Sequence, residues 1–280
     1  MLLAAAWAGD SVFASGDKQH LRRFNTSLIL AWRLFIRDAS AKYRQSILGV
    51  FWAVVTPLFL VGVLVLLNKS GIVTFSERQI PYPLFAVVGV SVWGIFATGV
   101  NMASECLKTA GKTMLKVNFP KTSLVLAASW MGLLEFVIRL PVIIALCVYY
   151  FSRGEVQLEP AGIVAAFFLL IPLYILALAL GFILSVVGAV LQDITYFLPI
   201  ATGALMLLSP ILYPISPESL LGKASHLNPI AHFAETSRNV LLGIGSVNNG
   251  YWISSFIAAV LLALGFRFFS FAQRRVLERI

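Results

Sequence analysis

The stretch RDASAKYRQSILGVFWAVVTP, residues 37–57, joins a cluster of cationic side chains to the start of a long apolar run. The run extends from Ile47 to Leu67 and contains no charged side chain. A helix needs about 20 mostly apolar residues to cross the hydrocarbon layer of a bilayer. The junction therefore predicts a membrane-spanning helix with a basic segment at one end.

The composition of the whole chain agrees with a membrane protein. Hydrophobic residues make up 59% of the sequence and charged residues only 12%, whereas soluble domains carry about 25% charged residues. The formal net charge of +9 comes from segments that flank apolar runs, as membrane topology requires, so we expect no nucleic-acid partner. Cys106 and Cys147 have no metal-site spacing and indicate neither a zinc site nor a disulfide framework.

Six apolar segments predict an all-α membrane protein with six transmembrane helices, which together form a transmembrane domain over residues 47–271. A cytoplasmic tail (1–24) and an amphipathic interface helix (25–46) precede it, and a basic cytoplasmic tail (272–280) follows. The predicted spans are 47–68, 84–103, 123–150, 161–191, 195–214 and 251–271.

The distribution of Lys and Arg predicts the orientation, because positively charged loops stay in the cytoplasm. With the N-terminus inside, the inner segments hold fifteen of the 21 Lys and Arg residues. The interpretation is that both termini are cytoplasmic.

Residues 28–44 have the periodicity of an amphipathic helix lying at the inner membrane surface. Two roles remain open for it, an anchor on anionic lipid and a docking platform for a cytoplasmic partner. The apolar side comprises Leu28, Trp32, Phe35, Ile36, Ala39 and Tyr43, and the opposite side comprises Arg33, Arg37 and Arg44.

The inner segment 104–122 forms a second basic region. Lys108, Lys112 and Lys116 are spaced four residues apart before Pro120, which predicts a short cationic helix. Gly111-Lys112-Thr113 resembles the end of a phosphate-binding loop, but Cys106 occupies the position of the first glycine. We therefore expect no nucleotide site in this chain.

Glu135 and Arg139 lie one helical turn apart within the third span. Isolated charges are costly inside a membrane, so the two side chains should pair or face water. One hypothesis is a structural ion pair that faces the helix bundle. The other is a position that lines a polar conduit.

A long proline-containing segment follows the fifth span. Asn228 can cap a helix with Pro229 in its first turn, and Gly243 can end that helix. The apolar side of this helix indicates that it dips back into the membrane and closes a pore from outside. His226 and His232 have no carboxylate or cysteine at ligand spacing, so no metal site is expected.

Taken in order, these motifs resemble the membrane subunits of ABC transporters that export cell-surface polysaccharides. The resemblance covers about residues 25–275. The matching motifs are Arg37-Asp38, Tyr43-Arg44-Gln45-Ser46, Leu48-Gly49, Trp52, Pro57-Leu58, Asn118-Phe119-Pro120, Ser209-Pro210, Tyr213-Pro214, Asn228-Pro229 and Arg238. One departure is Gln192-Asp193, where members often have Arg-Asp.

The resemblance implies a half-transporter that forms a homodimer and binds two copies of a cytoplasmic ATPase subunit. That subunit would bind ATP and Mg, and this chain would bind no cofactor and perform no catalysis. Candidate ATPase-coupling residues are Arg37, Asp38, Lys42, Tyr43, Arg44, Lys108, Lys112 and Lys116.

The resemblance also implies a channel for a lipid-linked glycan, with an outer gate over residues 215–243. Trp52, Trp93 and Tyr213 could present flat faces to sugar rings, or could instead be interfacial or packing aromatics. Glu135 and Arg139 complete the channel candidates, and the gate candidates are Pro214, Asn228, Pro229 and Arg238.

The expected function is export of lipid-linked polysaccharide, with O-antigen as the leading substrate, across the bacterial inner membrane. Alternatives with the same fold export teichoic acid, capsule, drugs or lipids. A membrane-embedded enzyme of glycan assembly is the alternative from another class. Against it, Glu135 and Asp193 lie on different predicted spans, and no clustered carboxylates lie at a membrane face.

Overall fold

The computed structural model describes residues 25–44, 49–70, 80–111, 119–213 and 219–277. These described ranges contain helices and loops and no strand, which confirms the all-α prediction. A first helix covers residues 25–44. The labelled helices are α2 (Phe51–Lys69), α3 (Tyr82–Thr109), α5 (Thr122–Ser152), α6 (Pro160–Phe168), α7 (Ile171–Val190), α8 (Asp193–Leu207), α9 (Leu220–Ser225), α10 (Pro229–Leu241) and α11 (Asn249–Leu277).

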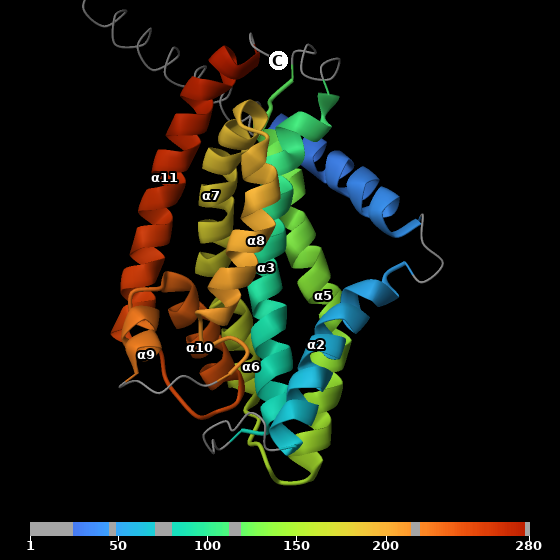
Figure 1. Ribbon diagram of the computed structural model, residues 1–280, viewed down its shortest axis with the longest axis vertical. Coiled ribbons are helices and arrows are strands. Elements are labelled where there is room, and N and C mark those ends of the chain that lie inside the picture. The colour runs from blue at the N-terminus through green and yellow to red at the C-terminus, as the bar shows by residue number, and fades with distance from the viewer. Residues whose placement is uncertain (1–24, 45–48, 71–79, 112–118, 214–218, 278–280) are drawn as a thin grey trace, which may run out of the picture.

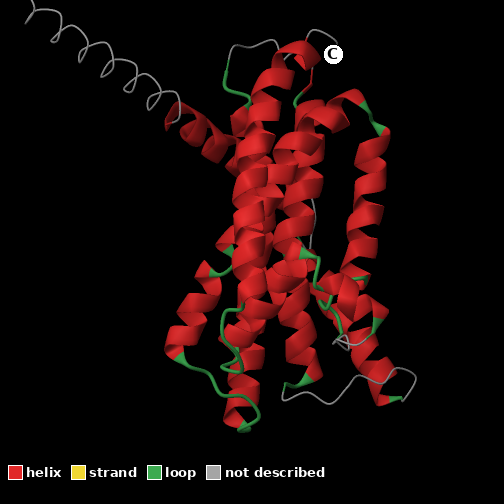
Figure 2. Cartoon of the chain, turned by 90° about the vertical axis from the view of Figure 1, so that its left-hand side faces the viewer, coloured by secondary structure: helices red, strands yellow, loops and turns green. Residues whose placement is uncertain are grey.

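The long helices lie side by side in one elongated bundle (Figure 1). Helix 25–44 and the C-terminal turns of α3 and α11 lie toward one end of the bundle, hereafter the basic end (Figures 1 and 2). Exposed cations of helix 25–44 and Lys108 of α3 give this end its charge. The C-terminal end of α5 and the start of α3 define the opposite end.

Helix α3 forms the centre of the bundle and packs most extensively on α5 and α7. In the most apolar stretch of α3, 83% of the residues are buried, compared with 17% for α11 and 6% for α2. Glycines allow the close approach: a Cβ on Gly132 of α5 would lie 2.4 Å from the carbonyl oxygen of Ile95 in α3. Helices α2, α5, α7, α8 and α10 pack on α3, and α11 packs on α7. The outer helices expose apolar side chains outward.

Five of the six predicted spans correspond to helices that are long and apolar enough to cross a membrane. The span predicted at 161–191 consists of α6 and α7, which are separated at residues 169–170. The segment predicted at 195–214 overlaps α8, an apolar helix of only 15 residues that begins at Asp193 and is about 22 Å long at 1.5 Å per residue. Proline disfavours helical conformation in the residue before it, and Pro210 follows the end of α8 closely.

The predicted amphipathic helix at 28–44 is confirmed as a helix, but the face that it buries against the bundle differs from the predicted apolar side. Ala31 and Leu34 are buried against the bundle. Trp32 and Ile36 remain 55% and 46% exposed. The helix therefore presents one apolar face to the protein and another outward, as a helix lying at a membrane surface requires.

Candidate functional site

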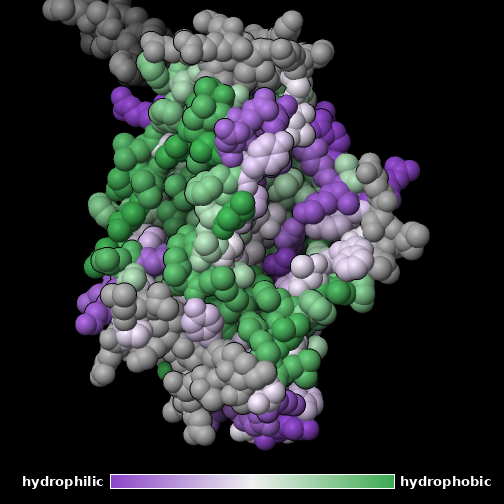
Figure 3. All heavy atoms as spheres, in the orientation of Figure 1, coloured by the Kyte–Doolittle hydropathy of each residue, from purple (hydrophilic) through white to green (hydrophobic). Residues whose placement is uncertain are grey.

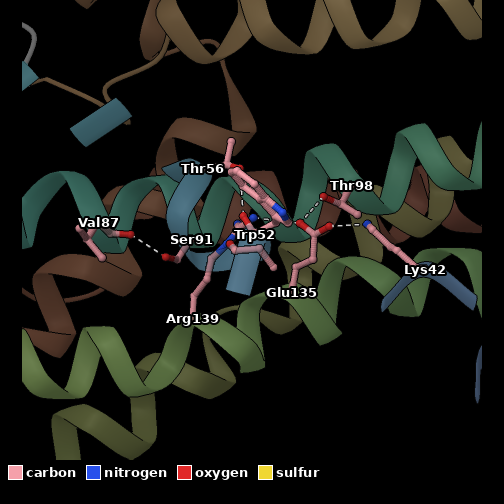
Figure 4. Close-up of polar contacts among 9 residues, drawn as sticks. Lys42, Trp52, Thr56, Val87, Ser91, Thr98, Glu135 and Arg139 are labelled. Carbon is pink, nitrogen blue, oxygen red and sulfur yellow. Dashed lines mark hydrogen bonds and ion pairs between the residues drawn. The ribbon is translucent and has the colours of Figure 1, made fainter. Parts of the chain in front are cut away.

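The centre of the candidate site is Glu135 of α5, whose carboxylate binds two cations from different parts of the chain (Figure 4). Oε1 accepts a hydrogen bond from Nζ of Lys42 on helix 25–44 at 2.7 Å. Oε2 lies 2.9 Å from Nη2 of Arg139 and accepts a hydrogen bond from the Thr98 hydroxyl of α3 at 2.9 Å. One side chain thus joins the basic surface helix to two helices of the bundle.

Arg139 extends this cluster to α2. Its Nε donates a hydrogen bond to the carbonyl oxygen of Ala53 at 2.9 Å. In a regular helix that carbonyl would accept from the residue four positions later, which here is Pro57, and proline has no N–H. Arg139 therefore supplies the donor that Pro57 lacks and ties α2 to α5.

The cluster carries one negative and two positive charges. The side chains of Glu135 and Arg139 are only 11% and 12% exposed, whereas that of Lys42 is 37% exposed. Burial strengthens the attraction between opposite charges, and removing one partner leaves a costly unpaired charge. The ion pair predicted from the spacing of Glu135 and Arg139 is confirmed, and Lys42 adds a third member.

The cluster lies along an open, polar part of the surface. Lys42, Trp52, Glu135 and Arg139 line a groove of about 340 Å³. An adjoining groove between α2 and α3, of about 580 Å³, is lined by Thr98 and Arg139 among others. Figure 3 shows hydrophilic residues gathered on this face, between apolar surfaces on either side. The ion pair therefore faces the bundle and also borders the groove.

Tyr43 lies beside the cluster on helix 25–44. Burial, with a smaller contribution from the Glu135 carboxylate, raises the pKa of Tyr43 to about 12. Nζ of Lys42 lies 5.8 Å from the centroid of the Tyr43 ring. The phenol therefore stays neutral at physiological pH and contributes an apolar ring under the Lys42 cation.

A second cluster joins α10 to α3 nearer the opposite end of the bundle. Arg238 is completely buried. Its guanidinium carbon lies 3.5 Å from the centroid of the Phe85 ring, and Nη2 donates to the Pro210 carbonyl at 3.3 Å. A Cβ on Gly89 would lie 2.3 Å from the Ile211 carbonyl oxygen. Glycine at position 89 thus lets the segment after α8 pack against α3.

Asn228 fixes the start of α10 within the same region. Its Oδ1 accepts from the backbone N–H of Ile230 at 3.0 Å, and Pro229 occupies the first turn. Its Nδ2 donates to Oγ of Ser209 at 2.7 Å. Gly243 adopts a φ of 65° just beyond the helix. The predicted cap and stop of this helix are both confirmed.

The aromatic candidates differ in exposure. Trp52 is 53% exposed at the groove, whereas Trp93 is only 5% exposed and packs on Phe96. The Tyr213 hydroxyl donates to the carbonyl of Leu207. Of the three, Trp52 presents the most accessible ring.

The remaining coupling candidates are spread over the basic end. Arg37 and Asp38 form an exposed ion pair at 2.8 Å, and Arg44 is exposed. Nζ of Lys108 lies 5.4 Å from the centroid of the Tyr196 ring on α8. Lys112 and Lys116, together with the gate candidate Pro214, lie outside the described residues.

Sequence reasoning missed several residues of these clusters. Thr98 lies in an apolar segment with no distinguishing spacing, and Ser209 was noted only within the Ser209-Pro210 motif, with no sign of its bond to Asn228. The glycines Gly89 and Gly94 also went unnoticed, although a Cβ on Gly94 would lie 2.2 Å from Nη1 of Arg139. Only Pro57 carried a readable signal, because a proline inside a predicted helix implies a carbonyl in need of another donor.

The described part of the chain holds no group of three or more His, Cys, Asp and Glu residues close enough to bind a metal ion. His232 and His226, both in the predicted outer segment, interact through Nε2 of His232 and the His226 carbonyl at 2.9 Å. The clusters described above join helices through charge pairs, hydrogen bonds and ring contacts.

Comparison with known proteins gives relatives that cover most of the chain. Over 200 residues the chain is 28% identical to the O-antigen export system permease protein RfbA of Myxococcus xanthus, which covers 69% of this chain and 73% of that protein. Two Klebsiella pneumoniae proteins of the same name are each 24% identical, one over 81% of this chain and 85% of its own length, the other over 86% and 91%.

The ABC-2 type transporter family matches residues 29–242, which include most of helix 25–44, the Glu135 cluster and the Arg238 cluster. This range covers most of the 280 residues. The chain is a membrane protein of helices packed around α3, with a basic helix tied to the bundle at one end, and it belongs to the ABC-2 type transporter family.

Proposed function

We propose that this chain is the membrane subunit of an ATP-driven exporter of lipid-linked O-antigen across the bacterial inner membrane. It acts as a homodimer with two copies of a separate ABC ATPase, which binds ATP and Mg. The names of the relatives support the substrate class, and the family supports the ATPase partner.

The observation that carries the mechanism is the Glu135 cluster. Lys42 lies on the exposed basic helix, where a cytoplasmic ATPase would dock, and its partner Glu135 lies on α5 and also binds α3 through Thr98. Arg139 adds α2. A displacement of helix 25–44 by the ATPase would pull directly on three bundle helices through these contacts. We infer that this cluster transmits the power stroke.

In this proposal the basic end faces the cytoplasm, as the distribution of Lys and Arg requires. The segment α9–α10 then lies toward the outer side, beneath the short helix α8, and re-enters the membrane. Arg238 holds α10 against Phe85 and Pro210 when the exit is closed. Between the cytoplasmic end and this outer segment, Tyr213 and Trp52 are available to contact the sugar rings of the substrate.

The substrate is tested by deleting the gene in its native host and examining surface lipopolysaccharide. The expected result is loss of O-antigen from the surface with carrier-linked polymer accumulating inside. Restoration by the plasmid-borne gene is the control. Unaltered surface O-antigen in the deletion strain would disprove the substrate assignment.

The transmission role is tested with Lys42→Gln in the complex with its ATPase, reconstituted in vesicles. The neutral side chain removes the ion pair to Glu135, so transport per ATP hydrolysed should fall about tenfold while the complex still assembles. Arg33→Gln is the matched control, because Arg33 is an exposed cation of the same helix. Equal coupling in the two variants would refute the role of Lys42.

A further inference from the structure

A cavity of about 180 Å³ lies between α3, α5, α6 and α10, and its lining on α5 runs from Phe136, the residue after Glu135, to Val148. Val88 and Val92 of α3 form one wall, and Phe136 and Cys147 of α5 form another. Ala166 of α6 closes a third side. Helix α6 is a separate short helix because the chain turns at residues 169–170 before α7 begins.

The lining of this cavity offers nothing to a polar occupant. Its residues are apolar apart from Ser237 of α10, and the Ser237 hydroxyl already donates to the Phe233 carbonyl at 2.7 Å. Water enters a cavity only where several polar partners are available, and an apolar cavity of about 150 Å³ in a soluble protein stays dry and binds benzene. The chemistry of the lining therefore selects a hydrocarbon.

The mouth of the cavity opens toward the bilayer. Three of its lining residues, Ile144, Val148 and Phe167, are 57%, 58% and 43% exposed on the outside of the bundle. These residues lie on α5 and α6, whose outer surfaces are otherwise apolar. Hydrocarbon chains of the surrounding lipid thus meet the opening directly.

An exposed cation follows the end of α5, beyond this mouth. Arg153, at the end of α5, is exposed and lies 4.6 Å from the Tyr149 ring centroid. It follows Val148 by five residues, which corresponds to about 7.5 Å along a helix. Glu155 is exposed beside it. A phospholipid phosphate above the opening would have the Arg153 guanidinium within its reach.

We propose that this cavity binds the end of one acyl chain of a glycerophospholipid from the leaflet at the opposite end of the bundle. Ser237 and Leu241 of α10 form part of the lining and flank Arg238. The bound chain therefore contacts the helix that we propose as the gate, and it fills the space behind that helix when α10 is packed on α3. The binding itself is independent of the transported substrate.

The test uses the full chain in complex with its ATPase, in vesicles of phosphatidylethanolamine and phosphatidylglycerol that contain a phospholipid with a diazirine near the acyl terminus. After illumination, peptide mass spectrometry locates the adducts. We expect adducts on the cavity residues of α5 and α6 at a yield at least fivefold above that on the lipid-facing residues of α11, such as Phe256 and Val260.

Ala166→Phe fills the cavity, so its adducts should fall at least fivefold while those on α11 stay constant. Ala259→Phe is the matched control, because Ala259 is exposed on α11 away from the cavity. Cys147→Leu fills less space and serves if Ala166→Phe does not fold. Cavity adducts that persist in the filled variants, or that never exceed those on α11, would overturn the proposal. So would labelling by an isoprenoid diazirine probe but not by the phospholipid.

Discussion

Two arginines lie against α3 at different heights, and each lies next to a glycine of that helix. Arg139 passes Gly94 and pairs with Glu135, which also binds Lys42. Arg238 lies near Gly89 and stacks on the Phe85 ring. The first arginine is held by opposite charge near the middle of α3, and the second is enclosed by a ring and a backbone carbonyl.

The difference in surroundings indicates a difference in how each contact opens. The Lys42 side chain is 37% exposed, so water can replace its partner and the bond to Glu135 can break at modest cost. Arg238 is wholly buried, so it can be released only when α10 separates from α3. In the proposed mechanism, the Glu135 cluster would transmit movement gradually and the Arg238 contact would open in a single step.

The largest effect should follow loss of the shared carboxylate. Glu135→Leu leaves Arg139 buried without its acidic partner, and breaking a buried pair in this way costs about 3–5 kcal/mol. We expect a markedly lower thermal unfolding temperature in detergent, measured by tryptophan fluorescence, together with loss of coupled transport.

The double variant Glu135→Leu with Arg139→Leu is the control for this experiment. Removal of both buried charges should recover part of the stability, because two apolar side chains can replace a buried pair at little cost. Coupling should not recover, since Lys42 still lacks its partner. If the double variant were as unstable as the sum of the two single variants, the charges would not be interacting.

The two glycines of α3 provide the second test of the comparison. Ala at position 89 places its methyl group against the Ile211 backbone, which cannot move aside, and overpacking of this kind costs about 1–3 kcal/mol. Ala at position 94 meets only the tip of the Arg139 side chain. Gly89→Ala should therefore lower the unfolding temperature more than Gly94→Ala.

Gly203 is the matched control, because a Cβ there would meet no atom within 4 Å. In a helix interior, Ala is favoured over Gly by about 0.5–1 kcal/mol, so Gly203→Ala should be neutral or stabilising. If Gly89→Ala and Gly94→Ala lowered the unfolding temperature equally, the Arg139 side chain would be as unable to move aside as the Ile211 backbone.

A smaller effect is expected at the start of α10. Asn228→Ala removes the cap on the Ile230 N–H and the hydrogen bond to Ser209, and loss of such a cap costs about 0.5–2 kcal/mol. Proteolysis within α10 should become faster. Asn228→Asp keeps the capping oxygen and loses only the amide donor, so an equal increase in both variants would mean that the bond to Ser209, and not the cap, holds the helix.

The smallest effect concerns alkaline pH. The pKa of Tyr43 is raised from its ordinary value of 10.0 to about 12, so the folded protein holds this proton more tightly than the unfolded chain. Its contribution to stability is complete below pH 10 and disappears as the pH rises toward 12. Wild type should thus lose stability more steeply than Tyr43→Phe over that interval. Parallel pH profiles would contradict this assignment.

Local patterns predicted much of this structure. The i, i+4 spacing of Glu135 and Arg139 predicted their ion pair because both lie on one helix, and Asn228-Pro229 predicted a helix start from its own chemistry. Lys42 was a candidate only as an ATPase-coupling residue that the family resemblance implied. Its bond to Glu135 spans 93 residues of sequence, and no local periodicity carries information about which helix lies opposite.

Hydrophobicity alone did not predict the length of every membrane-spanning helix, or which side of a helix faces the protein. The apolar run over 195–214 predicted a full span, but α8 ends at Leu207. Pro210 follows closely, and proline disfavours helical conformation in the residue before it. Trp93 and Trp52 both lie in apolar runs, yet the first is 5% exposed and the second 53%. Which side of a helix faces protein in lipid is not encoded by polarity, since both sides are apolar.

The contrast between α3 and α2 affects how the protein can be assembled. Only 6% of the residues in the apolar stretch of α2 are buried within the chain. Lipid can therefore cover the surface of α2 as soon as the helix inserts into the bilayer. In the proposed homodimer, a second copy that packed on α2 would replace lipid with protein there without any refolding of the interior. Biogenesis and complex formation can then proceed as separate events in time.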